Sequence, residues 1–94
     1  MSNYINGSYI EVTGGRIWYQ VIGNGPGLPL ITLHGGPGST HFGLEPLQAI
    51  GADRPVVFYD QLGCGNSDRP NDPGLWHIDR FVNELLTLVR SLGF

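Results

Sequence analysis

The sequence has no lysine, a single cysteine and no long apolar run, and each shortage excludes a class of protein. The sequence has five arginines and eight acidic residues, for a formal net charge of −3. No basic patch is therefore available to neutralise the phosphates of a nucleic acid. Cys64 alone excludes an internal disulfide and fits a reducing compartment. The apolar stretches are about five residues long, far below the ~20 of a membrane span, and residues 1–4 lack the basic and apolar regions of a signal peptide. We therefore expect a soluble, cytoplasmic chain with neither nucleic acid nor membrane as a partner.

Glycine and proline are abundant instead. The fifteen Gly and seven Pro gather in three stretches, which indicates structured loops of demanding geometry rather than a low-complexity segment. The 40% hydrophobic content predicts a folded chain, and 94 residues suit one small domain. A chain of this size buries only about 60–65% of its unfolded surface, so its core is expected to be marginal.

Short β-rich runs alternate with loops along the first sixty residues. Residues 9–12 and 16–22 are separated by Thr13-Gly14-Gly15, a signal for a tight hairpin. Residues 30–33 and 55–60 are almost unbroken apolar runs, typical of buried strands, and we expect the first to be covered on both faces. Between them, residues 44–50 are predicted to form a short helix with Pro46 in its first turn.

The clearest helix begins at Ile78 and ends at Gly93, a good stop signal, although no usual capping residue precedes Ile78. Its predicted apolar face consists of Ile78, Phe81, Val82, Leu85, Val89 and Leu92. The opposite face is predicted to carry Asp79, Arg80, Asn83, Glu84 and Arg90. A hairpin followed by strand–loop–helix repeats predicts an α/β fold with parallel βα units and right-handed crossovers.

The segment Leu33-His34-Gly35-Gly36-Pro37-Gly38 is the most informative in the chain. A buried strand that ends in consecutive glycines leaves backbone N–H groups accessible at the carboxyl edge of a sheet. Donors at that place stabilise the negative oxygen of an acyl-transfer intermediate, and α/β-hydrolases take one from a glycine-rich loop after their third strand. The alternative is an ordinary tight turn. For His34, a role as general base competes with hydrogen bonds that fix the loop, and we favour the second.

A second loop, Asp60-Gln61-Leu62-Gly63-Cys64-Gly65-Asn66-Ser67, follows the next predicted strand. Within this loop, Gly65-Asn66-Ser67 matches the start of the G-x-S-x-G nucleophile elbow, but the closing glycine is absent. We therefore expect Asp60 and Ser67 to brace a sharp turn instead. Cys64 has no local feature that would activate its thiol, and a catalytic role for it is disfavoured. His41 and His77 have no partners at metal-ligand spacing, and no metal or other cofactor is expected.

The next residues suggest local contacts. Asp68 and Arg69 are expected to form a surface or loop-bracing pair of little energetic weight. Trp76 is expected to pack its loop onto the helix that starts at Ile78 rather than to line a pocket.

Together these motifs resemble the proline iminopeptidases, serine aminopeptidases of the α/β-hydrolase fold that remove an N-terminal residue, often proline, from peptides. The likeness rests on LHGGPG at 33–38, on YDQLGCGNSDRP at 59–70 and on Leu75-Trp76 leading into the helix with RFVNEL at 80–85. It runs from about Tyr9 to Phe94. Amino-acid amidases and esterases share these motifs, so a related amidase or esterase is an alternative, as is a non-catalytic truncated domain that acts as a binding partner.

The resemblance implies which residues form the site. The backbone N–H of Gly36 would enter the oxyanion hole, with Gly35 shaping the same loop and with His34, Pro37 and Gly38 supporting it. No G-x-S-x-G occurs in the 94 residues, so residues 1–94 are expected to be the N-terminal segment of one incomplete α/β-hydrolase domain, truncated before the nucleophile strand. The expected partners are a peptide or amino-acid amide or ester substrate and the remainder of a hydrolase chain.

Overall fold

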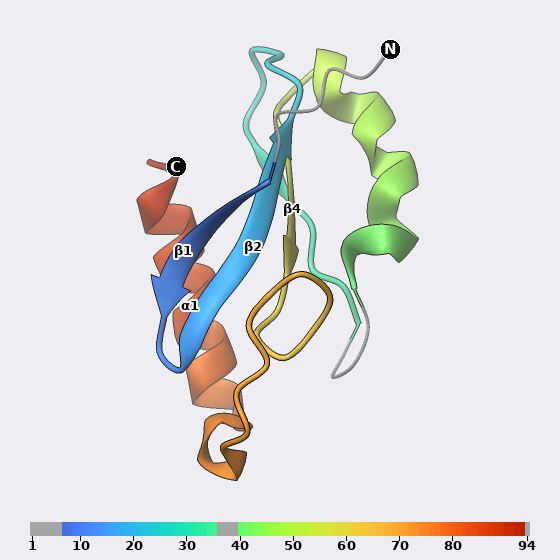
Figure 1. Cartoon of the computed structure of the whole chain (residues 1–94). Coiled ribbons are helices and arrows are strands. Elements are labelled where there is room, and N and C mark those ends of the chain that lie inside the picture. Colours follow the sequence, from blue (N-terminus) through green and yellow to red (C-terminus); the bar gives the residue numbers. More distant parts are fainter. Residues whose placement is uncertain (1–6, 36–39, 94) are drawn as a thin grey trace.

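A four-stranded mixed sheet forms the centre of the molecule (Figure 1). The computed structural model describes residues 7–35 and 40–93, except for the side chain of residue 42. The strands lie in the order β1-β2-β4-β3, with bounds Ser8–Val12 for β1, Gly15–Ile22 for β2, Leu30–Ile31 for β3 and Val56–Asp60 for β4. The predicted hairpin is confirmed, because β1 and β2 pair antiparallel from Val12 opposite Gly15.

Strand β4 is the most buried element. It pairs antiparallel with β2, with Trp18 opposite Asp60, and parallel with β3, with Ile31 opposite Val57. All five of its residues are buried, as its nearly unbroken apolar sequence predicts for a strand with neighbours on both edges and both faces.

One helical element covers each face of the sheet. The α-helix α1, Ile78–Ser91, lies on one face, and the 3₁₀ helix η1, His41–Ala52, lies on the other (Figure 1). Successive residues of β4 therefore serve different cores. Phe58 packs with Leu44 and Leu47 of η1, whereas Tyr59 belongs to the cluster that packs with side chains of α1 such as Leu85.

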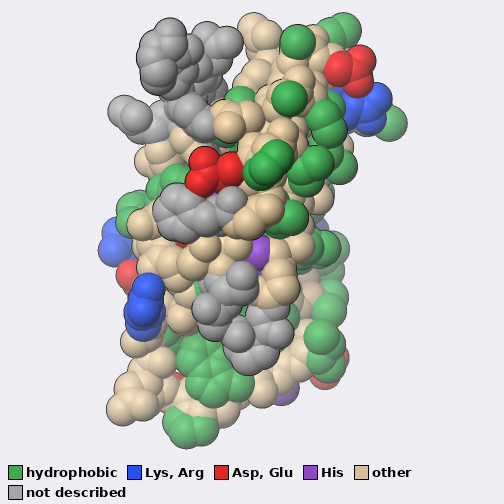
Figure 2. Space-filling view, turned by 90° about the vertical axis from the view of Figure 1, so that its right-hand side faces the viewer, with side chains coloured by type: hydrophobic (Ala, Val, Ile, Leu, Met, Phe, Trp, Pro, Cys, Tyr) green, Lys and Arg blue, Asp and Glu red, His purple; other side chains and the backbone are tan. Residues whose placement is uncertain are grey.

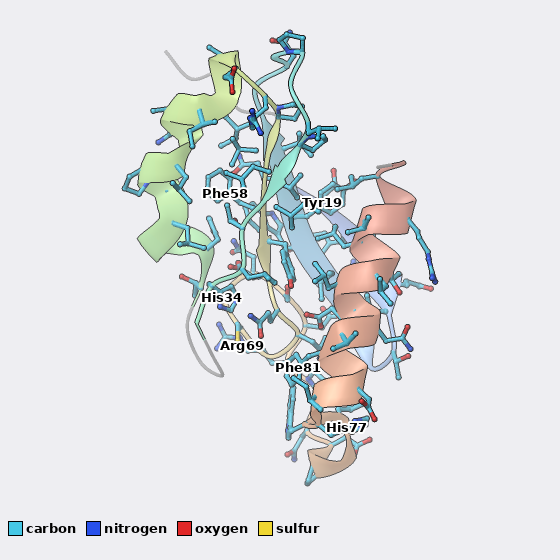
Figure 3. All side chains as sticks on the ribbon, turned by 180° about the vertical axis from the view of Figure 1, so that it is seen from behind. Tyr19, His34, Phe58, Arg69, His77 and Phe81 are labelled. Carbon is cyan, nitrogen blue, oxygen red and sulfur yellow. The ribbon has the colours of Figure 1, made fainter. Side chains whose placement is uncertain are left out.

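The two cores are separate clusters. The α1 side is centred on the buried residues Ile17, Val57, Tyr59, Leu62 and Leu88, and the η1 side on Ile22, Val56 and Phe58. Figure 3 shows Tyr19 on the α1 side of the sheet and Phe58 on the η1 side. Seen from the η1 side, hydrophobic side chains gather over the part of the surface that η1 covers (Figure 2).

Element η1 differs from the predicted helix over 44–50. It begins three residues earlier, at His41, and continues to Ala52 as a 3₁₀ helix, with Pro46 in its interior rather than in its first turn. Proline lacks the N–H that an α-helix interior requires. The local sequence predicts a helix here, but it does not indicate that the helix is of the more tightly wound 3₁₀ type.

Strand β3 is shorter and more open than expected. Only Leu30 and Ile31 are in regular strand geometry, both are half-buried, and Leu33 is 56% exposed. The prediction of a strand covered on both faces is wrong for these residues. The sheet order explains why: among the described residues β3 is an edge strand, and nothing lies along its second edge.

The predicted faces of α1 also need correction. Arg80 and Glu84, assigned to the polar face, are 4% and 1% exposed, whereas Ile78 and Val82 are 73% and 49% exposed. The two buried side chains form an ion pair, with Arg80 Nη2 at 3.0 Å from Glu84 Oε1. Arg80 also donates to the carbonyl oxygens of Leu75 and Thr13. Such partners are the condition under which charged groups are tolerated inside a protein.

Both ends of α1 fall where the sequence places them. Gly93 follows the helix with a φ of 76°, in the left-handed region that ends helices. At the start, His77 takes the N-cap position, and its Nδ1 lies 3.4 Å from the N–H of Arg80. An imidazole thus replaces the usual hydroxyl or carboxylate cap, which is why the sequence has no standard capping residue before Ile78 (Figure 3).

Glycine at position 23 is required by the fold. Gly23 has a φ of 81°, and a Cβ there would lie 2.2 Å from the carbonyl oxygen of Gly51. We expect Gly23→Ala to lower the free energy of unfolding by at least the roughly 1–3 kcal/mol that a strained backbone conformation costs. Urea denaturation followed by circular dichroism measures this, with Gly43→Ala as control, because a Cβ at Gly43 meets nothing within 4 Å. Equal effects of the two substitutions would contradict the interpretation.

The buried carboxylate predicts a pH dependence. Burial is the main cause that raises the pKa of Glu84, against hydrogen bonds from Arg80 and from the N–H of Leu62. A raised folded-state pKa contributes stability that is fully present below the unfolded-state value, here 4.5, and is lost as pH rises through the folded-state value. Going from pH 7 towards pH 4.5, the wild-type chain should therefore gain stability relative to Glu84→Gln. Parallel stability curves for the two proteins in urea titrations would contradict this.

Candidate functional site

The glycine-rich segment begins where β3 ends. His34 and Gly35 are described, whereas Gly36, Pro37 and Gly38 lie outside the described residues. His34 is buried, at 5% exposed, and it lies beside the end of β4 (Figure 3). The start of the segment therefore sits at the carboxyl end of two adjacent parallel strands, where open α/β sheets bind ligands.

Both ring nitrogens of His34 are engaged by the backbone. Nε2 accepts a hydrogen bond from the N–H of Gln61 at 2.9 Å, so Nδ1 carries the proton and donates to the carbonyl oxygen of Gly35 at 2.6 Å. Gln61 returns a second bond, from its side-chain amide to the carbonyl oxygen of His34 at 2.9 Å. His34 is thus tied to the loop after β4, and neither of its nitrogens is free to act as a general base.

Gly35 faces open space. A Cβ built on it would meet no atom within 4 Å, and the residue is exposed. Packing therefore does not require glycine at this position. Its effect is to leave the backbone at residue 35 uncovered.

Asp60 binds His41, the residue at which the chain enters η1 after the glycine-rich segment. Oδ1 of this carboxylate accepts from the backbone N–H of His41 and lies 2.8 Å from His41 Nδ1. The side chains of His41 and Asp60 are both buried. The centroids of the His41 and Trp18 rings lie 4.6 Å apart. Residues 34–35 and 41 are therefore anchored to adjacent residues, Gln61 and Asp60, at the end of one strand.

The other oxygen of Asp60 shapes the loop that follows β4. Oδ2 accepts from the N–H of Asn66 at 3.0 Å, and the hydroxyl of Ser67 donates to the carbonyl oxygen of Asp60. Ser67 in turn accepts from the N–H of Trp18 in β2 at 2.8 Å. The prediction that Asp60 and Ser67 brace this turn is confirmed.

Gly65 packs closely against the carboxylate of Asp60. Its φ is 49°, and a Cβ on it would lie 2.3 Å from Asp60 Oδ2. The glycine therefore serves the close approach of the chain to Asp60, which gives the elbow-like sequence at 65–67 a structural role.

The acidic and basic residues beyond this turn do not pair with each other as expected. Asp68 accepts from the backbone N–H of Arg16 at 2.9 Å and pairs with its guanidinium at 3.4 Å, and these hydrogen bonds lower the pKa of Asp68. Arg69 instead donates to the carbonyl oxygen of Gly65 at 2.8 Å (Figure 3). The loop is thus fastened to β2, a distant partner that local sequence does not reveal.

Cys64 is buried, at 4% exposed, beside a hollow lined in part by Trp76 and Phe81. The indole of Trp76 stacks on the ring of Phe81 with centroids 6.2 Å apart, so Trp76 packs its loop onto α1 as expected. It also lines the hollow, so the expectation that it lines no pocket is wrong. Within residues 7–35 and 40–93, no three His, Cys, Asp or Glu side chains gather as metal ligands would. The helices of this part of the chain include none long and apolar enough to span a membrane.

Sequence reasoning missed the importance of His41 and Gln61. The sequence alone indicates an ordinary polar residue at His41, because its partner Asp60 is nineteen positions away, on the next strand. No local pattern joins the two, although each flanks one of the glycine loops that the sequence marks.

Known proteins similar to this chain share both its sequence and its fold. It is 55% identical over 86 residues to a proline iminopeptidase of Heyndrickxia coagulans, covering 90% of this chain and 30% of that protein. A proline iminopeptidase of Clostridium botulinum is 41% identical over 92 residues, covering 95% of this chain and 31% of its own length.

Solved structures agree. The proline iminopeptidase of Mycobacterium smegmatis superposes with a TM-score of 0.85 at 35% identity, covering 95% of this chain and 32% of that one. A proline iminopeptidase-related protein of Thermus thermophilus gives a TM-score of 0.84 at 34% identity, covering 94% of this chain and 32% of that one. The chain thus spans about a third of the length of the relatives it matches.

The family assignment rests on a match over most of the chain. Residues 29–94, which include β3, η1, β4 and α1, match the family described as the α/β hydrolase fold. The predicted α/β class and the resemblance to proline iminopeptidases are both confirmed, and the chain belongs to the α/β-hydrolase fold family.

Proposed function

We propose that this chain is the N-terminal part of a serine aminopeptidase that releases an N-terminal residue, proline above all, from peptides through an acyl-enzyme. The observation that carries the proposal is the glycine-rich loop at the carboxyl end of β3, within a stretch that is 55% identical to a proline iminopeptidase. In this proposal the chain supplies the oxyanion loop, and the remainder of the domain supplies the nucleophile, acid and base.

The chemistry needs a fixed donor where negative charge develops. When a serine attacks the scissile carbonyl, its oxygen becomes an anion, and a backbone N–H held roughly 2.7–3.1 Å from that position stabilises the transition state. By the family resemblance Gly36 provides this N–H. Gly35 beside it leaves open space for the substrate, and Pro37 and Gly38 continue the loop.

Hydrogen bonds on both sides of residues 36–39 support this role. His34 is bound to Gln61 by two bonds of 2.9 Å, and His41 is bound to Asp60 at 2.8 Å. An oxyanion donor is effective because it is oriented before the reaction starts and needs no rearrangement during it. Anchors at both flanks, each buried or partly buried, favour such an arrangement.

The 94 residues contain no G-x-S-x-G, so a nucleophile of the family type has to come from elsewhere. We expect the 94-residue chain alone to release no proline from a prolyl anilide above the buffer rate. The intact mass of the assayed sample establishes that the chain is unaltered. Turnover abolished by a serine-directed reagent would refute the expectation, and turnover abolished by thiol alkylation would point to Cys64 instead.

The activity itself is tested by completing the domain. In a chimera, the part of the Heyndrickxia coagulans relative that is C-terminal to its matched stretch is fused after Phe94. We expect this single chain to hydrolyse prolyl anilides. Parallel assays with other aminoacyl anilides and with amino-acid esters distinguish an iminopeptidase from an amidase or esterase. A folded chimera that cleaves none of them would overturn the proposal.

The oxyanion role of Gly36 is tested in the same chimera. Gly36→Pro removes the backbone N–H, and we expect kcat to fall by about 10²–10³ with a much smaller change in KM, as for the loss of one oxyanion donor. Gly43→Ala is the matched control, since it changes a glycine that no other atom crowds. Equal kcat values for the two variants would exclude Gly36 as a donor.

A further inference from the structure

Helix α1 begins at a cap that requires a neutral side chain. His77 is the N-cap residue, and its Nδ1 accepts the backbone N–H of Arg80 at 3.4 Å (Figure 3). A ring nitrogen accepts a hydrogen bond only when it carries no proton, so the proton of the neutral ring is on Nε2. The usual caps, Ser, Thr, Asp and Asn, keep an acceptor oxygen at every pH near neutral. The cap of α1 is therefore lost when the ring of His77 is protonated.

Protonation of His77 acts on the helix in two ways. The charged ring has an N–H at both nitrogens, so Nδ1 would meet the N–H of Arg80 as a second donor. The amino end of a helix also carries a partial positive charge, which repels a cation placed there. Imidazole is the side chain whose charge changes between about pH 5 and 8, and His77 is exposed to solvent. Both effects weaken the first turn of α1 as pH falls through this range.

The surroundings of His77 leave this added charge unpaired. The titratable and charged groups of the elements around it are Asp79, Arg80 and Glu84 on α1, Asp72 at the start of the 3₁₀ helix η2 (Pro73–Leu75), and Cys64 in the loop after β4. Asp72 caps η2 by accepting from the N–H of Gly74 at 3.0 Å. Glu84 is engaged by the guanidinium of Arg80. Among the described residues, His77 forms no ion pair with any carboxylate.

The first turn of α1 also closes over a hollow of about 780 Å³, whose lining includes Cys64 and His77. Trp76, just before the cap, stacks on Phe81 in the first turns of the helix, with ring centroids 6.2 Å apart. These two positions are those of the hydrophobic staple, which fixes the angle at which a chain enters a helix. The indole also lies against the loop after β4, since a Cβ at Gly63 would be 2.8 Å from it. The staple thus holds the helix start against the loop that carries Cys64.

We propose that His77 is a proton-sensitive cap: as pH falls, its protonation opens the first turn of α1, releases the staple of Trp76 on Phe81 and uncovers Cys64 in the hollow. Cap and staple act on the same turn, and only the cap depends on pH. Cys64 is 4% exposed while the staple is closed. The inference is independent of the proposed function, because it concerns the helix start and not the glycine-rich loop.

Hydrogen exchange of the backbone N–H groups of Arg80 and Phe81 tests the cap. It is measured in the 94-residue chain at about pH 7.5 and about pH 5.5, on either side of the usual titration of imidazole. His77→Ser provides an acceptor oxygen that does not titrate in this range, and His77→Ala provides no side-chain acceptor. Rates are compared between proteins at the same pH, so the intrinsic effect of pH on exchange cancels. All three proteins keep His34 and His41, so the titration of these two rings cancels as well.

The wild type should change sides between the two controls. At the higher pH we expect it to exchange as slowly as His77→Ser, about fivefold more slowly than His77→Ala, which is the effect of one cap. At the lower pH we expect it to match His77→Ala and to exchange about fivefold faster than His77→Ser. A wild type that follows His77→Ser at both pH values overturns the proposal. A wild type that follows His77→Ala at both also overturns it, because the imidazole would then not be a cap.

Labelling of Cys64 tests the effect on the hollow. Cys64 is the only thiol of the chain, and 4,4′-dipyridyl disulfide reacts with thiols at both pH values. Because the thiolate fraction at a given pH is taken to be the same in the two proteins, the ratio of the wild-type rate to the His77→Ser rate reports exposure. We expect this ratio to rise about fivefold from the higher to the lower pH, as the exchange rates do. A constant ratio would overturn the uncovering of Cys64.

The chimera with the Heyndrickxia coagulans relative contains the same helix start. Exchange in it is followed by mass spectrometry of a peptide that covers residues 77–85, with the same two substitutions. This measurement decides the proposal where the 94-residue chain gives no protected amides. Here too, a wild type that keeps the exchange rate of His77→Ser at the lower pH overturns it.

Discussion

One buried carboxylate connects the loops on which the candidate site depends. Asp60 is fully buried at the end of β4, where one of its oxygens holds His41 and the other holds the N–H of Asn66. A buried charge of this kind is tolerated only when its lone pairs are filled, and here backbone N–H groups and an imidazole fill them. Because η1 starts at His41 and the turn at 63–67 closes on Asn66, the placement of both follows from the position of this one side chain.

The next residue, Gln61, extends this control to the end of β3. Through its two bonds with His34 it joins the loop after β4 to the glycine-rich loop after β3. Two consecutive residues thus set the flanks of the segment that we propose as the oxyanion loop. Their effect is a matter of orientation, since neither side chain needs to touch a substrate to fix where the loop backbone lies.

Much of this arrangement was predictable from the sequence, and the failures have a common origin. Strand β4, the hairpin and the ends of α1 were found because apolar periodicity and glycine act locally. Arg80 and Glu84 were put on the wrong face because residue type alone indicates exposure, and only the tertiary fold brings Thr13 and Leu62 to them as partners. The glycine loop after β4 is located correctly by the sequence, but the pairing of His41 with Asp60 is not, because it joins residues on separate elements.

The register of the sheet has a consequence for synthesis of the chain. Trp18 pairs with Asp60 and Ile22 with Val56, so β2 meets its central partner only after about forty further residues have been made. During that interval the hairpin of β1 and β2 has no second layer and no third strand, and isolated two-stranded hairpins are marginal in water. Pairings so distant in sequence slow folding, because the loop between them must close before any contact is gained. The hairpin, η1 and the Asp60 loops therefore cannot reach their final contacts before β4 has been made.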